Sequence, residues 1–77
     1  MLVEVENRIR IITPLYTQHK GDPEIWMTAE QVAVAAEMPV SSVIELLGRW
    51  CRWGYCQENH GLYRLTDAGV RFADRLK

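Results

Sequence analysis

The chain has 77 residues, of which 48% are hydrophobic and 25% are charged, and its formal net charge at pH 7 is −1. This length predicts one domain, residues 1–77, near the lower limit for folding without a disulfide or metal, and the composition excludes a disordered protein. No apolar run approaches the roughly 20 residues of a membrane-spanning helix. The charged start MLVEVENRIR is unlike a secretory signal, so we expect a cytoplasmic protein with no membrane association.

The charge is unevenly distributed along the chain. Residues 1–39 carry three basic and six acidic side chains, a balance of −3, whereas residues 40–77 carry six basic and four acidic ones, a balance of +2. Any surface that faces an anionic partner is therefore expected in the second half.

Residues 1–20 are predicted to form an N-terminal helix, with a strand as the competing interpretation. Apolar residues recur at helical spacing, at Val5, Ile9, Ile12 and Tyr16. Pro14 predicts either a kink or a fresh helix start capped by Thr13. Ile11 and Leu15 lie beside the apolar face, where they either cover the underside of the same domain or offer an apolar surface for a homodimer.

A helix-turn-helix is predicted over residues 28–53, after a turn in KGDPE and a short edge strand in IWMT. Thr28 and Gln31 have the spacing of a capping box, which predicts a helix start, and Pro39 ends this helix. The inward face of the first helix comprises Val32, Ala33 and Ala36. The second helix begins at about Val40, and its inward face comprises Val43, Leu46, Leu47 and Trp50. Its opposite face is predicted to carry Ser41, Ser42, Glu45, Gly48, Arg49 and Arg52.

Residues 55–66 are predicted to form a β-hairpin and residues 67–76 a C-terminal helix. Gly54 is expected to end the preceding helix, and two β-prone runs, 55–57 and 62–65, flank a turn. Thr66 is expected to cap the last helix, whose inward stripe is Ala73 and Leu76. The predicted fold is thus mainly α with a small β-hairpin (α+β), in the order helix, strand, helix, helix, strand, strand, helix.

Residues 28–76 resemble the winged helix-turn-helix superfamily. Ala33 and Val43 occupy the positions where the motif places a small and a β-branched residue, whereas Glu37 stands where glycine is common. The ending LYRLTDAGVRFADRL is similar to bacterial regulators of the multiple-antibiotic-resistance (MarR) type, in which a wing strand enters a helix through Leu-Thr-x-x-Gly. The resemblance implies a small transcriptional regulator of prokaryotic or phage type that binds double-stranded DNA in a sequence-specific way.

The second helix of the motif is expected to enter the major groove. Ser41 and Ser42 stand at its N-terminus, where N–H groups favour a phosphate. Arg49 and Arg52 have the reach for guanine edges or phosphates, and Glu45 is suited to accept from cytosine.

Gly48 and the wing complete the predicted DNA-binding set. Gly48 in a helix interior indicates either close approach of a partner or no role at all. The wing adds Asn59, His60 and Arg64, although its tip lacks the Arg or Lys that commonly reaches a minor groove.

A winged-helix module that binds a protein instead of DNA is the alternative interpretation. Such an accessory subunit or small inhibitor would use Trp50, Trp53, the apolar first helix and the acidic N-terminal half. The neutral charge balance favours this alternative, whereas the Ser- and Arg-bearing outer helix favours DNA.

Metal binding and catalysis are not expected. Cys51, Cys56 and His60 provide at most three ligands, whereas a structural zinc site uses four. Without an export signal, a disulfide between the cysteines is not expected either. The sequence has no phosphate loop, HExxH pair or nucleophile elbow, so we expect no enzyme activity and no cofactor.

Overall fold

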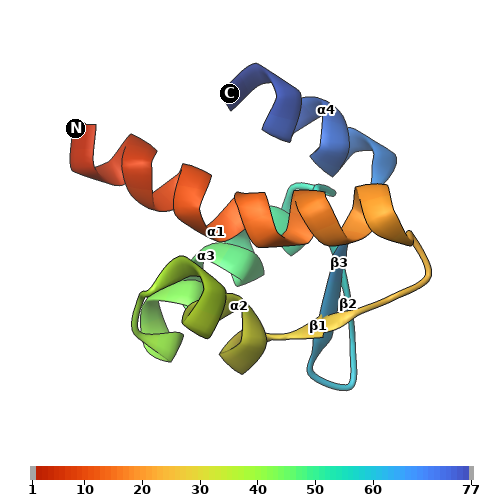
Figure 1. Ribbon diagram of the computed structural model, residues 1–77, viewed down its shortest axis with the longest axis horizontal. Helices are drawn as coiled ribbons and strands as arrows, with labels where there is room; N and C mark the ends of the chain where they lie inside the picture. The colour runs from red at the N-terminus through yellow and green to blue at the C-terminus, as the bar shows by residue number, and fades with distance from the viewer. Residues whose placement is uncertain (1, 77) are drawn as a thin grey trace.

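The computed structural model describes the backbone of residues 2–76 and the side chains from Glu6 onwards. Four helices surround a small antiparallel sheet (Figure 1). In chain order the elements are α1 (Leu2–Gly21), β1 (Met27–Thr28), α2 (Ala29–Ala36), α3 (Val40–Arg52), β2 (Cys56–Asn59), β3 (Leu62–Leu65) and α4 (Asp67–Leu76). This order and the α+β class confirm the sequence-based prediction.

Helix α1 continues through Pro14 without interruption, so the predicted fresh start is wrong. The hydroxyl of Thr13 does not cap a helix but donates to the carbonyl of Ile9 at 2.6 Å. Buried side chains on both sides of the proline, Ile12 and Leu15, hold the helix against the core. This packing compensates for the hydrogen bond that proline cannot donate.

The apolar face of α1 differs from the predicted one. Ile12 is fully buried as expected, and Ile9 and Tyr16 are half-buried, while the side chain of Val5 lies outside the described residues. Ile11 and Leu15 are 1% and 2% exposed. The interpretation that these two residues cover the underside of the same domain is therefore confirmed, and their interpretation as a dimer surface is wrong.

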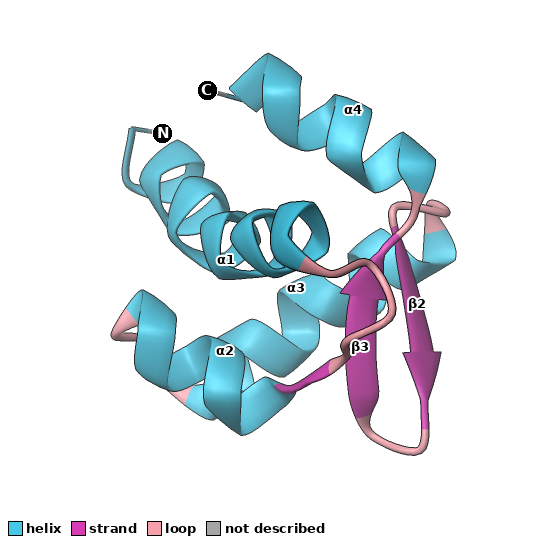
Figure 2. Cartoon of the chain, turned by 45° about the vertical axis from the view of Figure 1, so that its right-hand side comes forward, coloured by secondary structure: helices cyan, strands magenta, loops and turns pink. Residues whose placement is uncertain are grey.

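Helix α1 lies between α4 on one side and the α2–α3 pair on the other (Figures 1 and 2). The hairpin of β2 and β3, called the wing below, projects at the end opposite the start of α1 and the end of α4. Among residues 2–76 no single helix is long and apolar enough to span a membrane, and only α2 and α3 together, bent by 114°, reach that length and apolarity.

Helix α2 begins and ends with defined hydrogen bonds. The hydroxyl of Thr28 accepts from the backbone of Gln31 at 3.0 Å, and the Gln31 side chain accepts from the backbone of Thr28 at 2.9 Å, which is the predicted capping box. At the other end Glu37 adopts the left-handed conformation (φ 57°, ψ 47°), and Met38 donates to the carbonyl of Ala33. Glu37 thus makes the turn that glycine makes in the motif.

The inward face of α3 is as predicted. Val43, Leu47 and Trp50 have 0% exposure, and Leu46 is half-buried against the core. Burial of Trp50 also removes it from the set of residues proposed for protein binding. Its indole packs edge-on against Phe72 of α4, with ring centroids 5.8 Å apart.

The three strands form one antiparallel sheet in the order β1-β3-β2. β1 is an edge strand of two residues, shorter than the predicted IWMT segment. The wing turn has two residues, His60 and Gly61, both with positive φ, and Asn59 pairs with Leu62. Such a turn matches the twist of the flanking strands, so β2 runs on to Asn59 instead of ending at residue 57.

Helix α4 joins the wing through Thr66. Its hydroxyl accepts from the backbone of Gly69 at 3.1 Å, as expected of a cap, and donates to the carbonyl of Gly54 at 2.6 Å. Gly69 is buried, and a Cβ on it would overlap the carbonyl oxygen of Tyr55. The glycine of the Leu-Thr-x-x-Gly segment therefore permits α4 to pack directly on the start of the wing.

Candidate nucleic-acid interface

The outer face of α3 is open to solvent. Because Val43, Leu47 and Trp50 point into the core, the residues on the opposite side of the helix face outward. Of the six residues predicted for this face, Gly48 is half-exposed. The other five are exposed, namely Ser41, Ser42, Glu45, Arg49 and Arg52. α3 thus presents serine, glutamate and arginine side chains on one surface.

The N-terminus of α3 carries no side-chain cap. Pro39 occupies the N-cap position and has no side-chain oxygen to accept from the first turn. The N–H groups of the first turn of a helix have no partner within that helix. Together with the exposed hydroxyls of Ser41 and Ser42, they form a group of hydrogen-bond donors suited to an anion.

The two arginines of α3 differ in their surroundings. Arg49 donates to Glu45 at 3.1 Å, and these side chains are 46% and 72% exposed. An exposed pair of this kind contributes about 0.5 kcal/mol, so exchanging Glu45 for another anion costs little. Arg52 is exposed and forms no ion pair with any residue in the described range 2–76.

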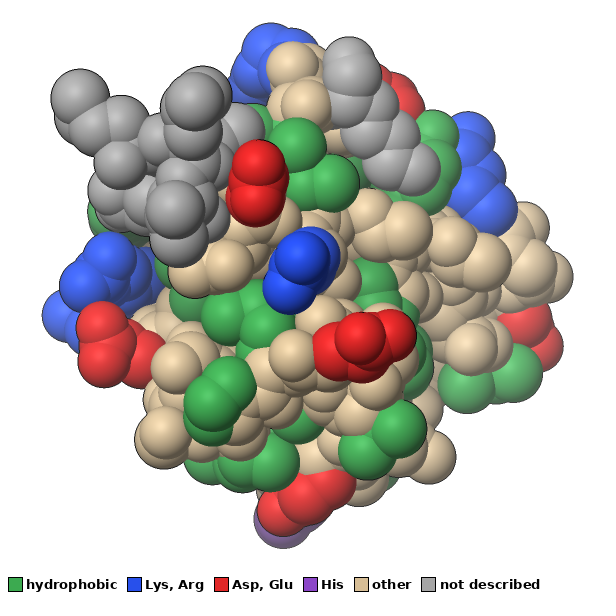
Figure 3. Space-filling view, turned by 60° about the vertical axis from the view of Figure 1, so that its left-hand side comes forward, with side chains coloured by type: hydrophobic (Ala, Val, Ile, Leu, Met, Phe, Trp, Pro, Cys, Tyr) green, Lys and Arg blue, Asp and Glu red, His purple; other side chains and the backbone are tan. Residues whose placement is uncertain are grey.

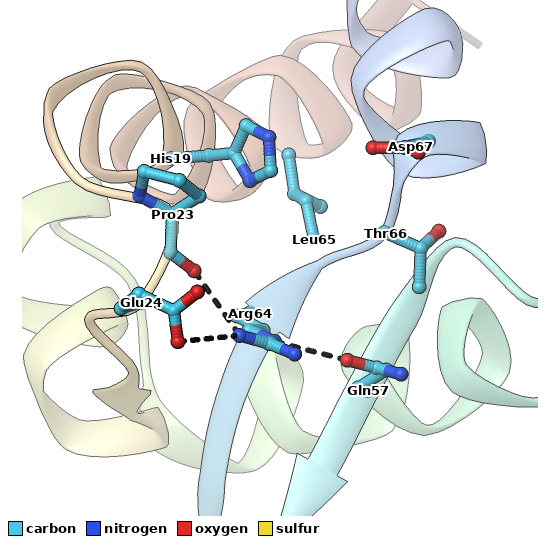
Figure 4. Close-up of a pocket in the computed structure, with 8 residues that line it drawn as sticks. All are labelled: His19, Pro23, Glu24, Gln57, Arg64, Leu65, Thr66 and Asp67. Carbon is cyan, nitrogen blue, oxygen red and sulfur yellow. Dashed lines mark hydrogen bonds and ion pairs between the residues drawn. The ribbon is translucent and has the colours of Figure 1, made fainter.

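Arg64 is held within the protein instead of extending from the wing. Its guanidinium donates to Gln57 at 2.9 Å and to the carbonyl of Pro23 at 3.2 Å (Figure 4). It also lies 3.9 Å from a carboxylate oxygen of Glu24 and 4.5 Å from the ring centre of Trp26. Arg64, Gln57, Pro23 and Glu24 line a hollow of about 360 Å³, and the contacts to Pro23 and Glu24 join β3 to the loop before β1.

The tip of the wing, residues 58–61, carries no arginine or lysine. Asn59 and His60 are exposed there, and a carboxylate oxygen of Glu58 accepts from the backbone of Gly61 at 2.7 Å. The face shown in Figure 3 likewise mixes acidic and basic side chains and has no continuous basic area. Any attraction of this protein to an anionic polymer therefore depends on α3 more than on the wing.

The cysteines and His60 are not brought together. Cys56 is buried at the start of β2 and Cys51 is half-buried near it, whereas His60 lies at the far end of the hairpin. Burial raises the pKa of both thiols, so they stay protonated near neutral pH. Among residues 2–76 no three His, Cys, Asp or Glu side chains form a group that would hold a metal.

The predicted outer face of α3 did not include two exposed apolar residues, Ile44 and Trp53. Ile44 is 47% exposed, and Trp53, just after the helix, is 60% exposed. Ile44 lies three residues after Ser41 and four before Gly48, a spacing that places all three along one side of a helix. This spacing was the signal in the sequence that would have located Ile44.

The sequence matches no protein-family model and no curated protein. The structure is similar to the crystal structure of a MarR family transcriptional regulator from Silicibacter pomeroyi DSS-3, with a TM-score of 0.70 and 22% sequence identity. The similarity covers 94% of this chain and 49% of that one, so the chain spans about half the length of the regulator. At this level of identity the similarity establishes the fold, which is a winged helix-turn-helix.

Proposed function

We propose that this protein binds double-stranded DNA in a sequence-specific way and acts as a small transcriptional regulator of prokaryotic or phage type. The observation that carries the proposal is the exposed outer face of α3, with its uncapped N-terminus, two serines and two arginines. The fold supports it, because a solved structure of similar fold is named a transcriptional regulator. The free thiols fit a cytoplasmic location.

In this proposal α3 lies in the major groove. Ser41, Ser42 and the first-turn N–H groups bind a phosphate at one wall of the groove. Arg52 and Arg49 contact guanine edges or phosphates at the other end, and Glu45 accepts from cytosine once Arg49 has left it. Asn59 and His60 at the tip of the wing lie along the backbone.

The charge of the protein limits the expected affinity. Arg64 is occupied by Gln57, Pro23 and Glu24, so the positive charge for DNA comes mainly from two arginines. Each neutralised phosphate contributes about −0.9 to the slope of log K against log salt concentration, which predicts a slope of about −2 for one copy.

A salt titration with an arginine control tests this function. Binding of a fluorescent duplex of random sequence is measured by anisotropy between low and physiological salt. We expect the slope to fall by about one in Arg49→Ala and in Arg52→Ala. Arg71→Ala removes the same charge from an exposed position of α4, outside the proposed interface, and should leave the slope unchanged.

Binding to a protein partner is the second candidate function. It is favoured by Trp53, whose side chain is 60% exposed beside Tyr55, and by the net charge of −3 in residues 1–39. The same titration separates the two functions. A slope near zero, or no binding at low salt, would contradict DNA binding and support the protein-binding module.

A further inference from the structure

Ile44 and Gly48 form an exposed apolar patch in the middle of α3, called the Ile44–Gly48 patch below. The side chain of Ile44 is 47% exposed, although the other long aliphatic residues of α3, Leu46 and Leu47, pack on the core. A Cβ on Gly48 would have no protein atom within 4 Å. Internal packing therefore explains neither the exposed isoleucine nor the missing side chain.

The position of the patch on the helix is informative. Ser41, Ile44, Gly48 and Arg52 follow one another at intervals of three or four residues and form one stripe along α3. The stripe runs from Ser41 to Arg52 and is about 16 Å long at the rise of an α-helix, which is comparable with the major groove width of about 12 Å. Its ends are donors for phosphates, and its middle is apolar.

Thymine is the base that offers an apolar group in the major groove, its 5-methyl group. We propose that the Ile44–Gly48 patch binds the 5-methyl group of a thymine, so that the preferred site has an A·T pair facing the middle turn of α3. This inference rests on the DNA-binding function proposed above. Ile44 supplies the methyl contact, and the bare backbone at Gly48 lets the base edge approach the helix.

Replacing thymine by uracil tests the contact directly, because it removes the methyl group and keeps the base pairing. A duplex is selected from a random pool with the intact protein, and each thymine is then replaced by uracil. We expect binding to the uracil duplex to be about fourfold weaker for each contacted methyl group. Ile44→Ala should bind both duplexes equally, and Ile44→Val should retain the difference.

Two further variants separate the patch from general effects on folding. Gly48→Ala should bind both duplexes several-fold more weakly while unfolding at a higher temperature than the unchanged protein. Val34→Ala removes an aliphatic side chain that is 79% exposed on α2, outside the proposed interface, and should retain the full thymine–uracil difference. Circular dichroism establishes that each variant is folded.

The outcomes distinguish this inference from the function on which it rests. Equal binding of the thymine and uracil duplexes, or a selected duplex without thymine, would overturn the inference and leave DNA binding intact. A difference that persists in Ile44→Ala would overturn it too, because another residue would then contact the methyl group. Absence of DNA binding at every salt concentration would overturn both.

Discussion

At the scale of single residues, Glu37 shows how the turn of the motif forms without glycine. Its backbone has φ 57° and ψ 47°, a left-handed conformation that costs a residue with a Cβ roughly 1–2 kcal/mol. The turn is nevertheless complete, because the N–H groups of Glu37 and Met38 donate to the carbonyls of Val34 and Ala33. The protein therefore carries a small local strain between the two helices of the motif.

We predict that Glu37→Gly stabilises the protein. Glycine adopts this conformation without steric cost, so the free energy of unfolding should rise by about 1 kcal/mol, as measured by urea denaturation. Glu30→Gly is the matched control, since it places the same substitution in the first turn of α2, where the backbone is helical, and should lower the free energy of unfolding. A loss of stability in Glu37→Gly would contradict the strained turn.

At the scale of elements, two helical glycines have opposite roles. Gly69 lies against the Tyr55 carbonyl where α4 packs on the start of the wing, and Phe72 of the same helix stacks on the ring of Tyr55. Gly48 faces open space on α3. The first glycine is required by packing between elements, whereas the second is not required by any contact within the described residues.

Alanine at these two positions should therefore change stability in opposite directions. Gly69→Ala forces α4 away from the wing and should lower the free energy of unfolding by about 2–3 kcal/mol, a typical cost of overpacking. Gly48→Ala should raise it by up to about 1 kcal/mol, the difference in helix propensity. Thermal unfolding of both variants by circular dichroism measures the two signs. A destabilised Gly48→Ala would indicate a packing role that the structure does not contain.

At the scale of the whole molecule, two polar contacts join parts of the chain that are distant in sequence. Arg64 connects β3 to the loop before β1 through the carbonyl of Pro23 and the carboxylate of Glu24. The hydroxyl of Tyr16 donates to Asp74 at 2.7 Å and so connects α1 to α4. Both contacts supplement the apolar core in fixing the position of α1 and the wing.

The Tyr16–Asp74 contact predicts a dependence of stability on alkaline pH. The hydrogen bond to Asp74, together with burial and the nearby negative charge, raises the pKa of Tyr16 above its ordinary value of 10.0. Its contribution is therefore fully present below pH 10.0 and is lost as the pH rises through the raised pKa. Tyr16→Phe should be less stable than the unchanged protein near neutral pH, and the difference should shrink above pH 10.0.

Thermal unfolding between pH 8 and pH 11 in steps of about half a unit measures this difference. Asp74→Asn provides the control, because it keeps an acceptor for the phenol and removes the negative charge that opposes its ionisation. That variant should lose less stability on going to alkaline pH. A difference between Tyr16→Phe and the unchanged protein that stays constant across the range would rule out the linkage.

Local signals explain why most of the fold was predictable from the sequence. Three helix boundaries are marked by signals only a few residues long. They are the capping-box spacing of Thr28 and Gln31, the proline before α3 and the threonine before α4. The inward residues of α3 follow from helical periodicity. These features require no knowledge of contacts between distant segments.

Contacts between distant segments account for what the sequence did not predict. The burial of Ile11 and Leu15 depends on α1 being covered from two sides, so the pattern within α1 left a dimer surface open as an alternative. The partners of Arg64 in residues 23–26 are likewise about 40 positions away in the chain. The exposed face of α3 follows from helical spacing, as at Ser41 and Arg52, and the same spacing also indicates Ile44, which the prediction from the sequence omitted.

The double hydrogen bond of Thr66 has a consequence for anyone who wishes to shorten or fuse this chain. One hydroxyl holds the segment after α3 and the start of α4 at once, and the ring of Phe72 covers both Tyr55 and Trp50. Deleting the segment after Leu65 would expose the indole of Trp50 to solvent. The same deletion would remove the contacts of Thr66 and Phe72 that hold the start of the wing. A reporter or affinity tag should consequently be appended beyond Leu76 and never substituted for the last helix.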